Sequence, residues 1–320
     1  MQDAPFHQFA SDGTTPAWAF WAQADDGVRL RLALWQVAPD NAAAPDPRGT
    51  VLLFPGRTEY LEKYAPTALA MNAQGYAVLG IDWRGQGLSD RLQDDPRPGH
   101  VDAFSDYQRD VVEMIVAATD LDLPRPWHLL AHSMGGCIGL GALLNDLPVE
   151  RAVFSAPMWG INLRQMPQGM ALGMAYIAGR LGRGGRAAPS GGGAGTYVLD
   201  EAFSQNLLTG DASEWCRMVR EAAAWPELTL GGASFNWVSQ ALNECSRLDR
   251  EPSPQVPTLV SLGNLERVVS AAAIRDRVAR WDGATLLELD NCRHEPMMES
   301  ADVRDRFLQS ALAHFDAVDP

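Results

Sequence analysis

The sequence has no long apolar run and little cysteine, and these shortages exclude several classes of protein. No stretch of about 18 apolar residues occurs, which is the length that a membrane-spanning helix requires. The four cysteines are scattered without the C-x-x-C spacing of zinc sites, at Cys137, Cys216, Cys245 and Cys292. We therefore expect buried packing cysteines, and neither a metal, a cofactor nor a disulfide framework.

Positive charge is also scarce. The 320 residues contain 26 Lys and Arg against 40 Asp and Glu, and the formal net charge is −14. A surface of this charge repels phosphate backbones at long range, so we expect no nucleic-acid partner. The N-terminal residues MQDAPFHQFASDG show neither the basic nor the apolar region of a secretory signal, which predicts a cytoplasmic protein.

The order of the apolar segments predicts an α/β fold. Asp25-Asp26-Gly27 is a hairpin signal between two strand-like segments. From Thr50 onward, short apolar segments alternate with amphipathic ones, which is typical of a parallel sheet with helices on both faces. We predict a mostly parallel sheet of eight strands, at 17–24, 28–37, 50–54, 76–82, 127–131, 151–157, 257–262 and 284–290.

This alternation stops after Pro157 and resumes at residue 257. Helical pieces and glycine-rich loop fill the interval. A chain of this length suits one α/β domain that carries an insertion. We predict a core formed by residues 1–156 and 246–320 and a helical cap formed by residues 157–245.

Residues 131–136, AHSMGG, contain one serine where an apolar strand turns into a helix. The flanking small residues permit a sharp turn that lifts Ser133 clear of the sheet, and the Met134 amide at the helix start favours negative charge. This pattern is typical of the nucleophile elbow, G-x-S-x-G, with Ala131 in the first glycine position. The alternative is that the small residues only let the helix pack on the strand.

Groups that follow other strands could act with Ser133, because sites gather at the carboxyl ends of parallel strands. Serine needs a base, and the base needs a carboxylate to orient it. His294 and Glu266 each follow a predicted strand, and the chain order Ser133, Glu266, His294 is the one that the nucleophile elbow requires. Asp290 is the rival acid, but it lies at the end of the strand that leads to His294. After 50–54, the amide of Arg57 could join that of Met134 in an oxyanion hole.

These segments together resemble the monoacylglycerol lipase and bacterial lysophospholipase branch of the α/β-hydrolases. The resemblance extends over nearly the whole chain from about Arg29 and is carried by FPGRTEYLEKYA, IDWRGQGLSD, AHSMGG, GNLERVV, CRHE and, in the insertion, NLLTGD and GGASFNWVSQAL. It implies Ser133 as nucleophile, Glu266 as acid, His294 as base, and the Arg57 and Met134 amides as oxyanion hole. Three positions depart from many relatives: Pro55-Gly56 replaces His-Gly, Asp82-Trp83 replaces Asp-His, and glutamate replaces aspartate at 266.

The predicted cap has the composition of an acyl-binding surface. Met166, Met170 and Met174 recur at helical spacing before three arginines, Arg180, Arg183 and Arg186. Methionines adapt to flexible apolar ligands, and cations match phosphate or an anionic lipid surface. We expect these methionines and Trp237 to contact the acyl chain in a tunnel, and the cap to touch a membrane surface transiently, at the inner face of the membrane. The alternative is a cap helix packed on the core with solvated arginines.

The sequence therefore predicts a serine carboxylester hydrolase that cleaves a lysophospholipid or a monoacylglycerol through an acyl-enzyme. Another ester, thioester or amide hydrolase of the same fold is the first alternative. The second is a catalytically silent binding protein, which a fluorophosphonate would fail to label.

Overall fold

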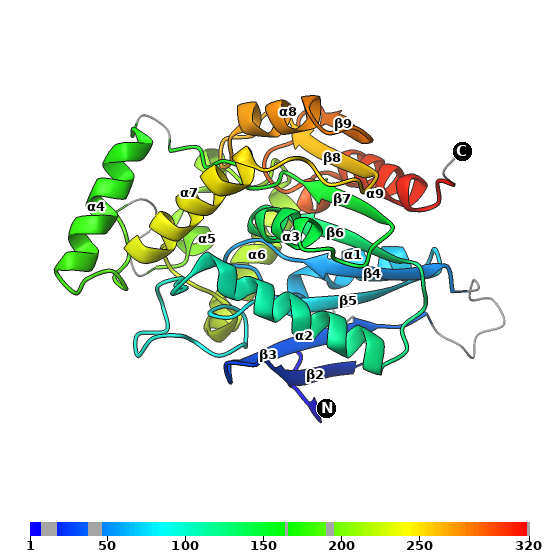
Figure 1. Ribbon diagram of the computed structural model, residues 1–320, viewed down its shortest axis with the longest axis horizontal. Helices are drawn as coiled ribbons and strands as arrows, with labels where there is room; N and C mark the ends of the chain where they lie inside the picture. Colours follow the sequence, from blue (N-terminus) through cyan, green and yellow to red (C-terminus); the bar gives the residue numbers. More distant parts are fainter. Residues whose placement is uncertain (8–17, 38–46, 164–165, 190–194, 319–320) are drawn as a thin grey trace.

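The computed structural model describes residues 1–7, 18–37, 47–163, 166–189 and 195–318. Its centre is one nine-stranded sheet in the order β1-β2-β3-β5-β4-β6-β7-β8-β9 (Figure 1). The strands are β1 (Gln2–Asp3), β2 (Trp18–Gln23), β3 (Arg29–Trp35), β4 (Gly49–Phe54), β5 (Tyr76–Asp82), β6 (Trp127–His132), β7 (Arg151–Ser155), β8 (Thr258–Gly263) and β9 (Ala284–Leu289). The predicted number of eight is therefore wrong by one, because β1 is too short to leave a pattern in the sequence.

The sheet is mostly parallel, as predicted. β2 and β3 form the expected antiparallel hairpin, β3 pairs antiparallel with β5, and every pair from β5 to β9 is parallel. Residues in β4 alternate between two apolar clusters, with Leu52 and Phe54 on one face and Val51 and Leu53 on the other. This strand is buried on both faces, which explains why it reads as a continuous apolar run rather than an alternating one.

Helices cover both faces of the sheet (Figure 1). Residues of α1 and α9 belong to one apolar cluster, and residues of α2, α3, α7 and α8 belong to the other. The helices are α1 (Ala65–Asn72), α2 (Tyr107–Asp120), α3 (Met134–Leu144), α4 (Gln168–Arg180), α5 (Tyr197–Asp200), α6 (Ala212–Ala224), α7 (Phe235–Arg250), α8 (Ala271–Ala279) and α9 (Ala301–Phe315). Short 3-10 turns occur at Leu61–Tyr64, Phe104–Asp106, Phe203–Gln205, Pro226–Leu228 and Pro296–Met298.

The segment between β7 and β8 contains α4 to α7, which lie together at one end of the sheet (Figure 1). The predicted boundary at residue 245 falls inside α7, because this helix runs without a break from Phe235 to Arg250. Trp237, Ala241, Cys245 and Leu248 of α7 pack into the core cluster. No helix among the described residues is long and apolar enough to span a membrane. Of the four cysteines, Cys216 is exposed, contrary to the expected burial, and the other three are buried.

Candidate active site

Ser133 occupies the turn between β6 and α3. Its backbone has φ 49° and ψ −115°, a region that residues with a Cβ seldom adopt. A Cβ at Gly135 would lie 2.1 Å from the Phe54 carbonyl oxygen, and one at Gly136 would lie 2.5 Å from the Pro157 Cβ. Glycine is needed at both positions so that the start of α3 can approach its neighbours, and Ser133 is thereby held at the carboxyl edge of the sheet.

The three predicted side chains lie in one hydrogen-bonded row. His294 Nε2 is 2.9 Å from Ser133 Oγ, and His294 Nδ1 is 2.8 Å from Glu266 Oε2. The other oxygen of Glu266 accepts hydrogen bonds from the amides of Val268 and Val269, at 2.6 and 3.1 Å. Because the carboxylate accepts at Nδ1, the proton of a neutral imidazole belongs on that nitrogen, and Nε2 is left to accept from the serine hydroxyl.

The charges within this row are mutually stabilised. Burial alone would lower the pKa of His294, but the Glu266 carboxylate and its hydrogen bond outweigh burial and raise this pKa. Burial would likewise raise the pKa of Glu266, yet His294 and the two backbone amides lower it. The side chains are 4 % and 1 % exposed, so little water screens the interaction. The arrangement therefore favours an ionised Glu266 and a His294 that accepts a proton readily.

The rival groups face elsewhere. Asp290 is exposed, and its Oδ1 accepts a hydrogen bond from the Asn264 side chain at 3.1 Å. The ring of His132 turns toward β7, with Nδ1 at 3.0 Å from the Ser155 carbonyl oxygen. Glu266, and neither of these groups, lies at hydrogen-bond distance from His294 Nδ1 among the described residues, so the geometry favours Glu266 as the partner of the imidazole.

Two backbone amides near Ser133 are available for a ligand. No described residue accepts a hydrogen bond from the amide of Arg57 or of Met134 among the contacts outside regular helices and strands. Met134 begins α3, where the helix dipole favours negative charge. Arg57 lies two residues beyond Pro55, whose carbonyl would be 2.5 Å from a Cβ at Gly135. Both amides therefore belong to segments that meet at the elbow.

The segment 55–58, which we call the oxyanion loop, is held from several sides. The Trp83 indole donates to the Pro55 carbonyl at 2.9 Å, and the Gln86 amide donates to the Gly56 carbonyl at 2.8 Å. Thr58 has φ 65° and its amide donates to Gln86 at 3.3 Å. A strained backbone persists only where its surroundings fix it, and such positions cluster at functional sites.

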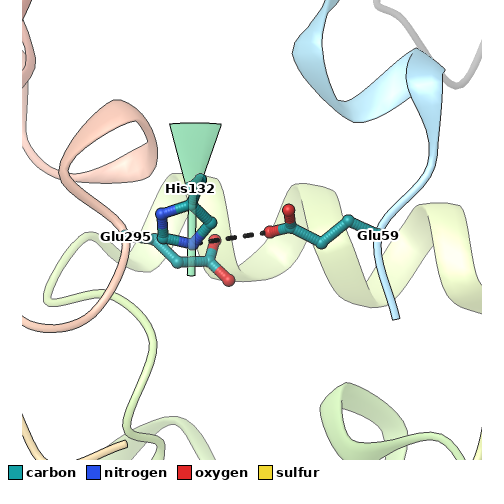
Figure 2. Close-up of side chains that lie close together, drawn as sticks. All are labelled: Glu59, His132 and Glu295. Atoms are coloured by element: carbon teal, nitrogen blue, oxygen red, sulfur yellow. Dashed lines mark ion pairs between the residues drawn. The ribbon is translucent and has the colours of Figure 1, made fainter. Parts of the chain in front are cut away.

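A buried ionic cluster lies beside the row of three. Figure 2 shows its acidic members, Glu59 and Glu295, close to His132, with a dashed line for the ion pair between Glu59 and His132. Lys63 Nζ is 2.7 Å from Glu59 Oε1 and 2.7 Å from Glu295 Oε2, and Glu59 Oε1 is 3.7 Å from His132 Nε2. The second oxygen of Glu59 accepts from the Gly56 amide in the oxyanion loop. Lys63 thus contacts Glu295, the residue after His294, and is linked through Glu59 to the oxyanion loop and to His132, the residue before Ser133.

The donor atoms of Glu59, His132 and Glu295 are close enough to hold a metal ion, but their charges are already compensated. Burial would lower the pKa of Lys63, and the two carboxylates outweigh it and raise this pKa. Burial would raise the pKa of Glu59, and Lys63 and His132 lower it. Burial lowers the pKa of His132 to about 4, so this imidazole is neutral near pH 7. These residues fit an ion-pair network better than a metal site.

Reasoning from the sequence missed this cluster. Glu59 and Lys63 are four residues apart, but His132 and Glu295 are distant in the chain and meet them because β4, β6 and β9 end at the same edge of the sheet. A signal was nevertheless present, because Lys63 is the only lysine in a chain whose other 25 cationic side chains are arginines.

The predicted cap residues differ in exposure. Trp237 is 6 % exposed, and the Arg57 guanidinium lies over its ring at 5.0 Å. Met166 and Met174 are half-buried, whereas Met170 is 56 % exposed. The face of α4 that is buried consists of alanines, at Ala171, Ala175 and Ala178. Small residues thus let α4 pack closely, and Met170 lies on its exposed side, while the contact of the three methionines with an acyl chain stays a prediction.

Comparisons with known proteins identify relatives over nearly the whole chain. Residues 45–301 match the family described as serine aminopeptidase, S33. The chain is 32% identical to the probable lysophospholipase L2 of Haemophilus influenzae over 325 residues, which cover 98% of each protein. It is 31% identical to lysophospholipase L2 of Escherichia coli K12 over 324 residues, covering 96% of this chain and 92% of that protein.

Solved structures support the fold. A soluble variant of monoglyceride lipase from Saccharomyces cerevisiae superposes with a TM-score of 0.74 at 17% identity, covering 98% of this chain and 97% of that one. Monoacylglycerol lipase from Paleococcus ferrophilus gives 0.68 at 18% identity, covering 89% and 98%. The chain therefore belongs to the serine aminopeptidase S33 family of α/β-hydrolases, together with the lysophospholipase L2 proteins, and is a serine hydrolase.

Proposed function

We propose that this protein hydrolyses the acyl ester of a lysophospholipid or a monoacylglycerol through an acyl-enzyme on Ser133. The observation that carries the proposal is the row Glu266, His294, Ser133, joined at 2.8 and 2.9 Å and buried at the carboxyl edge of the sheet. The names of the lysophospholipase relatives support a lipid ester as the substrate.

The geometry supports the following sequence of steps. His294 Nε2 takes the hydroxyl proton as Ser133 Oγ attacks the ester carbonyl carbon, and Glu266 stabilises the resulting imidazolium. The amides of Arg57 and Met134 donate to the oxygen that becomes negative. The imidazolium then gives its proton to the glycerol oxygen, which leaves as an alcohol. Water, deprotonated by His294, then attacks the acyl carbon. The bond to Ser133 Oγ breaks, the imidazolium returns its proton to that oxygen, and the fatty acid is released.

We further propose that residues 157–245 act as a cap whose outer face contacts a lipid surface. Four large apolar side chains on or next to α4 are exposed, namely Met170 at 56%, Tyr176 at 69%, Ile177 at 59% and Leu181 at 65%. The exposed arginines Arg180, Arg183 and Arg186 lie at and beyond the end of α4. An apolar face bordered by cations suits the interface of an anionic membrane. The rest of this acidic protein would be repelled by the same membrane. The cytoplasmic location stays a prediction.

Release of fatty acid from a panel of lysophospholipids and monoacylglycerols tests the activity, with the Ser133→Ala variant as the control. Hydrolysis that depends on Ser133 and favours these lipids over thioesters and amides is the expected result. A preference for amides or thioesters would contradict the assignment in favour of another hydrolase of this fold. Binding without turnover, and without labelling by a fluorophosphonate, would identify a silent binding protein.

A further inference from the structure

Among the described residues, the guanidinium of Arg57 lacks an acidic partner, unlike those of Arg31, Arg84 and Arg217. Arg277 lacks one there too, but its guanidinium donates to the carbonyl oxygens of Leu248 and Glu251. Arg31 pairs with Glu62 and Asp82 at 2.7 Å each. Arg84 and Arg217 each pair with two carboxylates in the same way. Within the described part of the chain, no carboxylate lies within ion-pairing distance of Arg57, although the protein carries 40 acidic residues.

The surroundings of Arg57 hold its side chain in place while leaving most of its donors unused. Nη2 donates to the Gly231 carbonyl at 3.0 Å, and Cζ lies 5.0 Å from the centre of the Trp237 ring. A Cβ at Gly99 would come within 2.9 Å of Nη2, so glycine is what makes room for the guanidinium. Nε is buried and finds no acceptor among the described residues. A guanidinium has five N–H donors, so an acceptor from outside the protein can be bound.

Burial of the Arg57 guanidinium without a carboxylate partner disfavours its charged form, and its pKa reflects this. Burial lowers the pKa of Arg57 to about 10, and a weaker interaction with Tyr107 offsets little of this. A cation that is desolvated without a counter-ion is costly, and an anionic ligand would remove that cost. Arginine also binds phosphate through two parallel hydrogen bonds, which lysine cannot form.

We propose that the Arg57 side chain binds the phosphate of the lysophospholipid head group while the scissile ester lies at Ser133. The inference rests on the proposed function and deepens it. Arg57 is the residue whose amide we assign to the oxyanion hole, so its side chain begins next to the ester. In a lysophospholipid the phosphate is attached to the same glycerol as the ester, only a few bonds away. The head-group phosphate is therefore bound by the oxyanion loop, and the exposed arginines at and beyond the end of α4 serve the lipid surface.

A comparison of two substrates tests this assignment. Lysophosphatidylcholine and monoacylglycerol with the same acyl chain are assayed below their micelle-forming concentrations, and the ratio of their kcat/KM values is determined. We expect Arg57→Gln to lower this ratio at least about tenfold, the usual effect of losing a hydrogen bond to a charged group. A loss of activity that affects both substrates equally cancels in the ratio. Arg109→Gln, which removes an exposed arginine of α2, should leave the ratio as it is in the wild type.

The Arg57→Lys variant is a control for a general effect of the substitution on folding. Arg57→Lys keeps the charge, so its ratio should lie well above that of Arg57→Gln. A ratio that Arg57→Gln leaves unchanged, or that the lysine and glutamine variants lower equally, would overturn the inference. Inorganic phosphate that raises the melting temperature of the wild type but not of Arg57→Gln, with an unchanged ratio, would assign the site to free phosphate instead. A wild type that cleaves neither lipid would contradict the proposed function itself.

Discussion

The hydroxyl of Ser133 and the imidazole of His294 share one hydrogen bond of 2.9 Å, and in the proposed mechanism neither transfers the acyl group without the other. We expect Ser133→Ala and His294→Ala each to lower kcat by roughly four to six decades, and the double variant to be little worse. Initial rates of fatty-acid release measure the effect. Losses that add on a logarithmic scale would mean that the two residues do not act as a unit.

Glu266 controls when His294 is able to accept a proton. The base acts in its neutral form, so activity is present above the pKa of His294 and is lost as the pH falls through it. Because Glu266 raises that pKa above its ordinary value, the acid limb of kcat/KM should lie above pH 6.5.

Replacing Glu266 by Gln should move this limb to lower pH and reduce the rate at the plateau, since the carboxylate no longer stabilises the imidazolium. Asp290→Asn serves as the matched control and should change neither, because Asp290 is exposed and bonded to Asn264. A pH profile that shifts in Asp290→Asn and stays fixed in Glu266→Gln would reverse the assignment of the acid.

The order of residues along the chain was enough to predict which residues form the candidate site, but not which side chains contact one another. Ser133, Glu266 and His294 could be selected because each follows an apolar strand and their order fits the elbow. The partners of Lys63 and the isolation of Arg57 depend on which side chains meet across the folded sheet. No local pattern encodes such contacts.

At the scale of the elements, Lys63 joins the segments that follow β4 and β9, because its ammonium contacts both Glu59 and Glu295. Removing one partner of a buried ion pair leaves the other charge uncompensated, at a cost of about 3–5 kcal/mol. We expect Lys63→Met to lower the free energy of unfolding by about this amount and to lower kcat as well. Urea denaturation followed by circular dichroism gives the first value.

Two further variants make the Lys63 prediction specific. Lys63→Met combined with Glu59→Gln should recover part of the lost stability, because one stranded carboxylate is then neutral. Arg275→Met, which breaks the exposed pair with Glu288, should cost less than about 1 kcal/mol. Equal costs for Lys63→Met and Arg275→Met would show that the cluster does not connect the loops.

Helix α4 was predicted as an apolar element bordered by arginines, but which of its faces is buried could not be read from its composition. The buried alanines and the exposed larger side chains became apparent only from its packing against α7. We expect Ile177→Asp to weaken binding to vesicles of anionic phospholipid in a sedimentation assay, since a charge would enter the apolar interface. Val112→Asp, at an exposed apolar position of α2, is the matched control. Equal binding by the two variants would contradict the role of α4.

For the whole molecule, the alternation of strands and helices sufficed to predict a mostly parallel sheet with an insertion near its carboxyl edge. The sequence did not reveal β1, which has two residues, nor the continuity of α7 across the predicted boundary of the cap. Both depend on pairing or packing with distant segments. The net charge of −14 likewise indicates the overall sign of the charge but not the local exceptions. These are the exposed arginines at and beyond the end of α4, and Arg57, which has no acidic partner in the described part of the chain.

The central claim is that hydrolysis of lysophospholipid proceeds through Ser133. The most direct measurement titrates the purified protein with a fluorophosphonate, which modifies activated serines, and follows the labelled peptide and the release of fatty acid from lysophospholipid together. We predict that activity falls in proportion to the modified fraction of Ser133 and vanishes at one label per chain. Hydrolysis that survives complete modification of Ser133, or a loss of activity that follows a label on another residue, would contradict the account.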